Sequence, residues 1–205
     1  MPEPVDHRDR KPLHLLEPQV SRGIVERFQL TTLLGRFHDR HVWAAFMFIN
    51  GFITIGSLAL LAMVTHTPFV FPSLGPTAFL FFFSPTQPTA SPRNTVYGHA
   101  IGILCGYGAL AATGLTGAPP AIQVGVDPMR ILAAALSLAL TGALMILLKA
   151  AHPPAGATTL IISLGIVTRP VYLLVIEVAV ILLTAQAILI NRLAGIEYPV
   201  WSKRQ

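Results

Sequence analysis

The feature that most constrains this chain is the scarcity of charge over a long central region. Between Val42 and Ile190 the charged residues are six in number: Arg93, Asp127, Arg130, Lys149, Arg169 and Glu177. Four stretches in this region, 42–65, 95–113, 129–150 and 171–190, are apolar and long enough to cross a bilayer as helices. The apolar fraction of 53% and the mean hydropathy of +0.65 also lie outside the range of soluble domains. The sequence therefore predicts an all-α, polytopic membrane protein with four full transmembrane helices in a lipid bilayer.

The remaining charge lies mostly at the two ends of the chain. Residues 1–41 hold seven Lys and Arg, and residues 192–205 contribute Arg192, Lys203 and Arg204. The formal charge of +5 would suggest nucleic acid in a soluble protein, but the positive-inside rule accounts for it here without a nucleic-acid partner. We therefore predict a cytoplasmic tail and interfacial helix over 1–41, a membrane domain over 42–191 and a cytoplasmic tail over 192–205. The helical spacing of apolar residues from Val20 to Phe37 places the interfacial helix there.

Two shorter apolar stretches are interrupted by proline. One covers 69–83, with Pro72 and Pro76 inside it, and the other begins at His152-Pro153-Pro154 and runs to about residue 164. Adjacent prolines stop a helix that approaches them, yet proline is favourable at the first positions of a new helix. Each stretch is therefore predicted to hold a half-helix that starts at membrane depth, where irregular backbone is tolerated only inside protein or along a water-filled cavity.

The two broken stretches repeat one another. Pro72-x-x-Gly75-x-Thr77 matches Pro153-x-x-Gly156-x-Thr158 at an offset of 81 residues, and each lies between two full helices. Paired, interrupted segments in corresponding halves of a chain point to a transport site. If the segments dip in and return, the chain crosses four times and the halves are parallel; if they cross, there are six crossings and the halves are inverted. The distribution of positive residues slightly favours crossing, whereas the shortness of the segments favours re-entry.

A helix N-terminus attracts anions because its first N–H groups lack partners. The two half-helices would present such groups around Gly75 to Thr77 and Gly156 to Thr158, where glycine permits close backbone approach. Neighbouring hydroxyls and two intramembrane histidines could add donors or carry a proton. The predicted binding and permeation residues are Ser73, Gly75, Thr77, His99, His152, Gly156, Thr158 and Thr159. The structural alternative is that the small residues pack helices together and the histidines bond to backbone.

Three charged residues are predicted to be accessory to this site. Arg93 would meet lipid headgroups or the C-terminal carbonyls of a broken segment, with Asn94 capping the next helix. Lys149 would reach the interface or attract anions towards His152. Glu177 is the acid deepest in an apolar stretch, where it could carry protons or pair with a nearby Arg or His.

These motifs resemble those of the HPP family of small integral membrane proteins. The resemblance rests on His152-Pro-Pro-Ala-Gly-Ala157, on Pro92-Arg93-Asn94 and on Gly98-His99, within a region from about Trp43 to Trp201. It implies a four-helix transmembrane protein, here in a bacterial inner membrane with both termini cytoplasmic. The cyanobacterial and plastid members are linked to nitrite transport, so the resemblance implies a small anion as substrate without fixing which one.

Three functions follow from these residues. The first is a channel or transporter for nitrite or a similar anion, with no catalytic residue, cofactor or metal, and homo-oligomeric because so few helices enclose little volume. The second is a membrane-embedded metal enzyme using His99, His152 and Glu177, although their spacing gives no helical ligand pair. The third, a sensor or assembly component, ranks last because 41 N-terminal residues are too few for a ligand-binding domain.

Overall fold

The protein is all-helical over the residues 29–202 that the computed structural model describes. The elements are α2 (Leu30–Leu34), α3 (Asp39–Thr65), α4 (Leu74–Phe83), the 3-10 helix η2 (Pro88–Ala90), α5 (Pro92–Ala112), α6 (Ala121–Val124), α7 (Pro128–Leu147), α8 (Ala155–Ser163) and α9 (Pro170–Leu193). Four of them, α3, α5, α7 and α9, are long and apolar enough to cross a membrane. The prediction of a polytopic helical membrane protein is confirmed.

Three of the long helices start at a proline, one to three residues before the apolar pattern predicted. Pro92, Pro128 and Pro170 occupy first-turn positions, where the missing N–H costs no hydrogen bond. The side chain of Ser91 caps α5 by accepting from the Asn94 N–H. The expectation that Asn94 caps this helix is therefore wrong, and its amide group instead donates to the carbonyls of Pro88 and Ala151.

Both broken stretches contain the predicted half-helix. α4 begins at Leu74, two residues after Pro72, and α8 begins at Ala155, directly after the proline pair. α8 ends in a left-handed turn at Gly165, whose φ is 81°, and the Ile166 N–H bonds back to the Ile161 carbonyl. Glycine adopts this conformation without the steric penalty of a side chain, so the position of Gly165 sets the length of α8.

Hydrogen bonds at the two ends of the bundle show that the segment containing α8 runs from one end to the other. At one end, the Arg93 side chain at the start of α5 bonds to the carbonyl of Lys149 after α7, and the Arg93 N–H bonds to the Trp201 carbonyl beyond α9. At the other end, the Arg130 guanidinium near the start of α7 bonds to the Ser163 carbonyl at the end of α8. The segment of α8 therefore leaves the end where α7 finishes and reaches the end where α7 begins.

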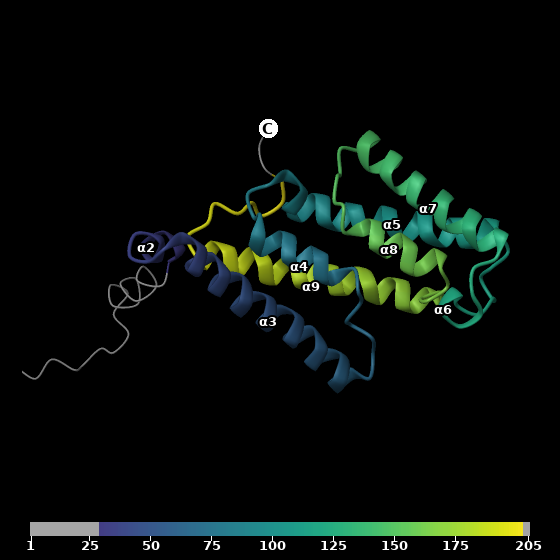
Figure 1. Ribbon diagram of the computed structural model, residues 1–205, viewed down its shortest axis with the longest axis horizontal. Coiled ribbons are helices and arrows are strands. Elements are labelled where there is room, and N and C mark those ends of the chain that lie inside the picture. The colour runs from purple at the N-terminus through teal and green to yellow at the C-terminus, as the bar shows by residue number, and fades with distance from the viewer. Residues whose placement is uncertain (1–28, 203–205) are drawn as a thin grey trace, which may run out of the picture.

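The two halves have the same element order and opposite directions. In Figure 1, α4 runs back towards the side on which α3 starts, and α8 runs the opposite way. The contacts correspond in pairs, since α3 packs on α4 and α9 as α7 packs on α8 and α5. Of the two arrangements left open by the sequence, these helix directions correspond to the inverted one.

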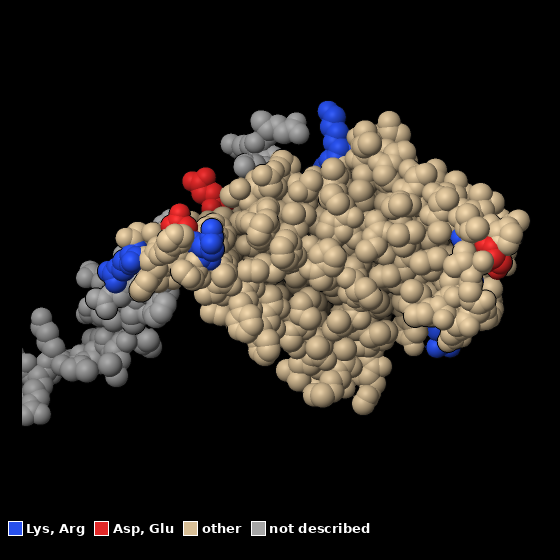
Figure 2. Space-filling view, in the orientation of Figure 1, with Lys and Arg blue, Asp and Glu red and all other residues tan. Residues whose placement is uncertain are grey.

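Side-chain packing and charge fit a bundle surrounded by lipid. The largest buried cluster joins α4 to α9 and includes Phe81, Phe82 and Leu183, none of which is exposed. On the face drawn in Figure 2, charged side chains lie at the margins and none lies in the middle. Of the predicted interfacial helix over 20–37, the structure describes α2, and the part before residue 29 lies outside the described residues.

Candidate functional site

Three glycines on one face of α5 bring this helix into close contact with α8. A Cβ at Gly102 would lie 2.8 Å from the Ala155 carbonyl oxygen, and one at Gly106 would lie 2.8 Å from the Thr159 carbonyl oxygen. At Gly98 it would lie 2.6 Å from the Cβ of His152. The spacing of four residues puts all three glycines on one side of the helix, as in close-packed transmembrane pairs. This contact sets how near the polar groups of α5 and α8 can come to each other.

Four polar side chains meet inside the bundle and are completely buried: Thr77 on α4, His99 on α5, His152 before α8, and Thr158 on α8. We call them the His–Thr cluster. His99 lies between the two threonines, with Nε2 2.9 Å from the Thr77 Oγ1 and Nδ1 2.7 Å from the Thr158 Oγ1. The Thr77 Oγ1 is also 3.3 Å from the Nε2 of His152, and the two rings are 5.0 Å apart between centroids. The side chain of His99 thus joins α4 and α8, the two repeated half-helices.

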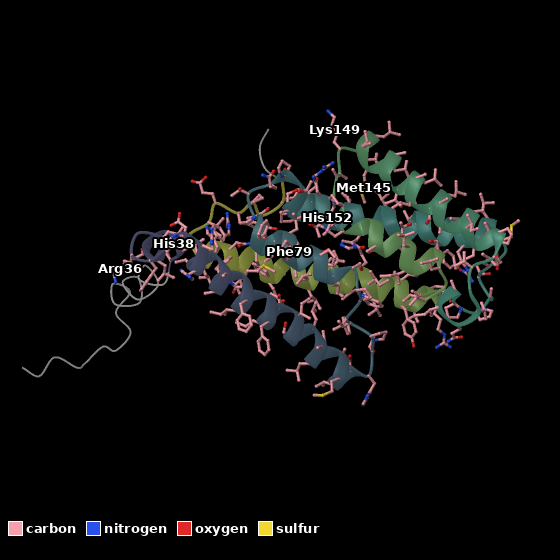
Figure 3. The ribbon with its side chains drawn as sticks, viewed as in Figure 1. Arg36, His38, Phe79, Met145, Lys149 and His152 are labelled. Carbon is pink, nitrogen blue, oxygen red and sulfur yellow. The ribbon has the colours of Figure 1, made fainter. Side chains whose placement is uncertain are left out.

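The outer edge of the cluster is formed by backbone and one further hydroxyl. The Nδ1 of His152 lies 2.8 Å from the Thr89 carbonyl oxygen and 3.3 Å from the Thr95 Oγ1, whose own hydroxyl donates to the Ser91 carbonyl. Figure 3 shows His152 inside the bundle and Lys149, three residues earlier, pointing away from it. The short segment between α7 and α8 therefore carries one side chain inwards and one outwards.

The two half-helix N-termini differ in their free donors. At α8, the N–H groups of Ala155, Gly156 and Ala157 bond to the carbonyls of His152, Pro153 and Pro154. At α4, the Leu74 N–H bonds to the Phe71 carbonyl, while the Gly75 N–H has no backbone acceptor within the described residues. The fully buried hydroxyl of Ser73 also lacks a partner there. The α4 N-terminus therefore keeps donors for a ligand in this conformation, and the α8 N-terminus does not.

Comparison with known proteins places the chain in a family. The family described as "HPP, transmembrane region" matches residues 38–199. The chain belongs to the HPP family. It is also 36% identical over 117 residues to a Dictyostelium discoideum protein named as a transmembrane protein. The aligned region covers 55% of this chain and 34% of that protein, so the chain spans about a third of its relative's length. No solved structure matches the chain.

In this HPP protein, the backbone and the side chains of the His152-Pro153-Pro154 triplet have separate roles. The carbonyls of all three residues take up the first N–H groups of α8, and the side chain of His152 fills the bundle interior. The corresponding position in the first half is Phe71, which is also buried. Thr77 and Thr158, which the repeat pairs, both reach His99. The repeat is therefore symmetric in its threonines and asymmetric in its histidines.

The two glycines of the repeated motif do not have the surroundings expected of a close backbone approach. Gly75 is exposed, and a Cβ there would meet nothing within 4 Å. A Cβ at Gly156 would meet the Cδ1 of Leu138 at an ordinary 3.4 Å. Thr159 is fully buried one residue beyond Thr158, and its hydroxyl lacks a partner. Of the predicted residues, the structure thus brings together Thr77, His99, His152 and Thr158, with Ser73 and Thr159 buried and unpartnered.

The three predicted accessory charges lie outside the cluster. Arg93 donates to the carbonyls of Leu148 and Lys149, which follow the full helix α7. One expectation was that Arg93 would instead meet the last carbonyls of a broken segment. The Lys149 side chain is exposed. Glu177 is half-buried, and neither of its carboxylate oxygens has a hydrogen-bond partner among residues 29–202, which does not fit the expected pairing with Arg or His.

The metal-enzyme alternative lacks its third ligand. His99 and His152 are neighbours, but Glu177 bonds to neither of them. Within residues 29–202, the structure has no group of three His, Cys, Asp or Glu side chains that could hold a metal ion. The donor set around His99 is instead made of hydroxyls, which are weak ligands for the metals that histidine prefers.

Sequence reasoning missed several residues that shape the site. Thr89 and Thr95 orient His152, and the buried Arg130 ties the end of α8 to the α5–α7 connection through the Ser163 and Pro119 carbonyls. The Gly98-x3-Gly102-x3-Gly106 pattern was visible in the sequence and is a known sign of close helix packing. By contrast, no local pattern identifies a partner such as the Thr89 carbonyl, because it comes from a distant turn.

Proposed function

We propose that this HPP protein transports a small anion, nitrite or one of similar size, and that the His–Thr cluster is part of its route. The observation that carries the proposal is a completely buried set of hydroxyl and imidazole groups joining both half-helices. In a bilayer, buried polar groups are costly and mark substrate or proton pathways.

The chemistry of the site suits weak binding of a monovalent anion. Thr77 and Thr158 contribute hydroxyls and His99 and His152 contribute imidazoles, and none of them carries an obligatory charge. These groups bond to one another at rest and would turn towards an anion on its arrival. Neutral donors let an anion enter without holding it too tightly to leave. The Ser73 hydroxyl and the Gly75 N–H at the start of α4 add two donors that have no partner. The transported anion would meet α4 first and the cluster next.

The distribution of charge supports an orientation. Arg36, Arg40, Arg93, Lys149 and Arg192 belong to the end at which α3 and α5 start and α7 and α9 finish. By the positive-inside rule this end would face the cytoplasm, so we propose that both termini lie in the cytoplasm of a bacterium and the bundle in its inner membrane. We also propose a homo-oligomer, because four full helices enclose little volume.

Anion flux into proteoliposomes tests the proposal. The purified protein would be reconstituted, and uptake of nitrite, nitrate, formate and chloride would be measured against protein-free vesicles at neutral pH, where little undissociated acid crosses the lipid. We expect flux of at least one of these anions, with His99→Gln reducing it and His66→Gln, an exposed histidine at the far end of α3, leaving it unchanged. Absence of flux for all four anions in folded protein would reject anion transport.

A further inference from the structure

The hydrogen bonds of the His–Thr cluster fix where its protons lie. A backbone carbonyl can only accept, so the contact of 2.8 Å between the Thr89 carbonyl and the Nδ1 of His152 requires a proton on that nitrogen. In a neutral imidazole the other nitrogen is then an acceptor. The Nε2 of His152 therefore needs a donor, and the hydroxyl beside it is that of Thr77.

This assignment propagates to the second histidine. Thr77 has one hydroxyl proton, which can go to the Ser73 carbonyl at 3.0 Å or to the bare Nε2 of neutral His152 at 3.3 Å. When it goes to His152, the Thr77 oxygen accepts from the Nε2–H of His99. The Nδ1 of His99 is then an acceptor, and the Thr158 hydroxyl donates to it over 2.7 Å. All donors point the same way, from Thr158 through His99 and Thr77 to His152 and the Thr89 carbonyl. The two neutral histidines are therefore opposite tautomers, with the proton on Nδ1 in His152 and on Nε2 in His99.

We propose that this directed chain moves protons and that anion transport by the protein is coupled to proton transport. This inference rests on the proposed function, because the proton is proposed as the ion that accompanies the transported anion. A proton arriving at the Thr158 oxygen displaces the hydroxyl proton to the Nδ1 of His99. The Nε2 proton of His99 passes to Thr77, and the former Thr77 proton passes to the Nε2 of His152. Thr158, His99 and Thr77 each gain one proton and lose one, so His99 changes its tautomer and His152 alone gains a positive charge.

Thr77 has a second acceptor that makes this step reversible. Its Oγ1 lies 3.0 Å from the Ser73 carbonyl, so its hydroxyl can turn there while its oxygen accepts from the Nε2–H of protonated His152. The positive His152 would then lie beside the α4 N-terminus, where Ser73 and Gly75 keep free donors for an anion. A bound anion would stabilise the imidazolium, and the imidazolium would stabilise the anion. This mutual attraction is the physical basis of coupling.

The surroundings limit the chain to one proton at a time. Among the elements packed on His152, the titratable group that touches it is His99 on α5, and α4 and η2 contribute Thr77 and the Thr89 carbonyl. Arg93 and Lys149 are the nearby permanent charges; Arg93 is engaged with backbone carbonyls and Lys149 points outwards. Two imidazolium rings 5.0 Å apart in a buried site would repel each other, so we expect one proton per anion.

The tautomers can be measured without any transport assay. Nitrogen-15 NMR of the histidine-labelled full chain in nanodiscs separates the two tautomers by chemical shift, and His99→Gln and His152→Gln assign the two signals among the seven histidines. We expect a proton on Nδ1 of His152 and on Nε2 of His99. A proton on Nε2 of neutral His152, or on Nδ1 of neutral His99, would overturn the directed chain.

Coupling is tested by recording nitrite uptake and internal pH together in the same proteoliposomes. An inward nitrite gradient should acidify the lumen by about one proton per nitrite. Thr77→Val should lower the number of protons taken up per nitrite by at least about tenfold, while Thr77→Ser retains the wild-type ratio. Thr184→Val, a buried threonine on α9 outside the cluster, is the matched control. Nitrite uptake without acidification in the wild type would overturn coupling and leave anion transport standing. Absence of anion flux would overturn both.

Discussion

Gly102→Ala tests the contact that holds the cluster together. The added Cβ would lie 2.8 Å from the Ala155 carbonyl oxygen, whereas ordinary contact begins at 3.4 Å, so α5 and α8 must separate by about 0.6 Å. The same shift would lengthen the 2.7 Å contact between His99 and Thr158 to about 3.3 Å. Overpacking of this kind costs about 1–3 kcal/mol of unfolding free energy. In a chain of this length each kcal/mol corresponds to about 2–4 °C in melting temperature.

The chain carries a built-in reporter for this measurement. Cys105 is its one cysteine, is buried, and lies on α5 between Gly102 and Gly106, so a thiol-reactive fluorophore reports when α5 leaves its partners. Gly108→Ala on the same helix is the matched control, because a Cβ there meets nothing within 4 Å. Alanine is the better helix former by about 0.5–1 kcal/mol, so the control should be neutral or stabilising. Equal shifts in the two variants would refute the packing argument.

Three further variants should change stability in the same thermal assay. Burial raises the pKa of the Tyr198 phenol above its ordinary value, so the stabilising contribution of this group is complete below pH ~10 and is lost as the pH rises further. Tyr198→Phe removes the hydrogen bond to the Ala90 carbonyl and should lower the free energy of unfolding by about 1 kcal/mol. The variant should also lose less stability than the wild type when the pH is raised above ~10. Arg93→Lys loses the fork that bonds two carbonyls and should lower the melting temperature, whereas Arg36→Lys at an exposed site should not. Glu177→Gln should raise the melting temperature, because the wild-type carboxylate is partly buried without a partner. A lower value would show that Glu177 has a stabilising contact.

The fold was predictable because its elements obey local rules. Apolar length identified α3, α5, α7 and α9, and prolines with the repeat at an offset of 81 residues located α4 and α8. The observed helix boundaries differ from the predicted ones where a cap or a proline sets the start, as at Ser91, whose hydroxyl caps α5 in place of the Asn94 side chain. The length of the two broken segments did not decide whether they cross the bilayer or re-enter it. The reason is that the extended residues before each half-helix add to the distance that the segment spans.

The candidate site was predictable in its residues and less so in its geometry. His99, His152, Thr77 and Thr158 were singled out by residue type and by the repeat, and the structure brings all four into contact. The free N–H groups expected at α8 are taken up by the carbonyls of the His-Pro-Pro turn, which depends on backbone angles that the sequence pattern does not report. The orientation of His152 depends on Thr89, 63 residues away, and long-range partners of this kind have no local signature.

The most direct test of the account is the initial rate of nitrite uptake by a variant in which Thr77→Val and Thr158→Val are combined. These changes keep the side-chain volume and remove both hydroxyls that contact His99. With equal amounts of folded protein, and with Thr184→Val as control, we predict a rate at least about tenfold below the wild type. A wild-type rate in the folded double variant would contradict the claim that the His–Thr cluster is part of the route of the anion.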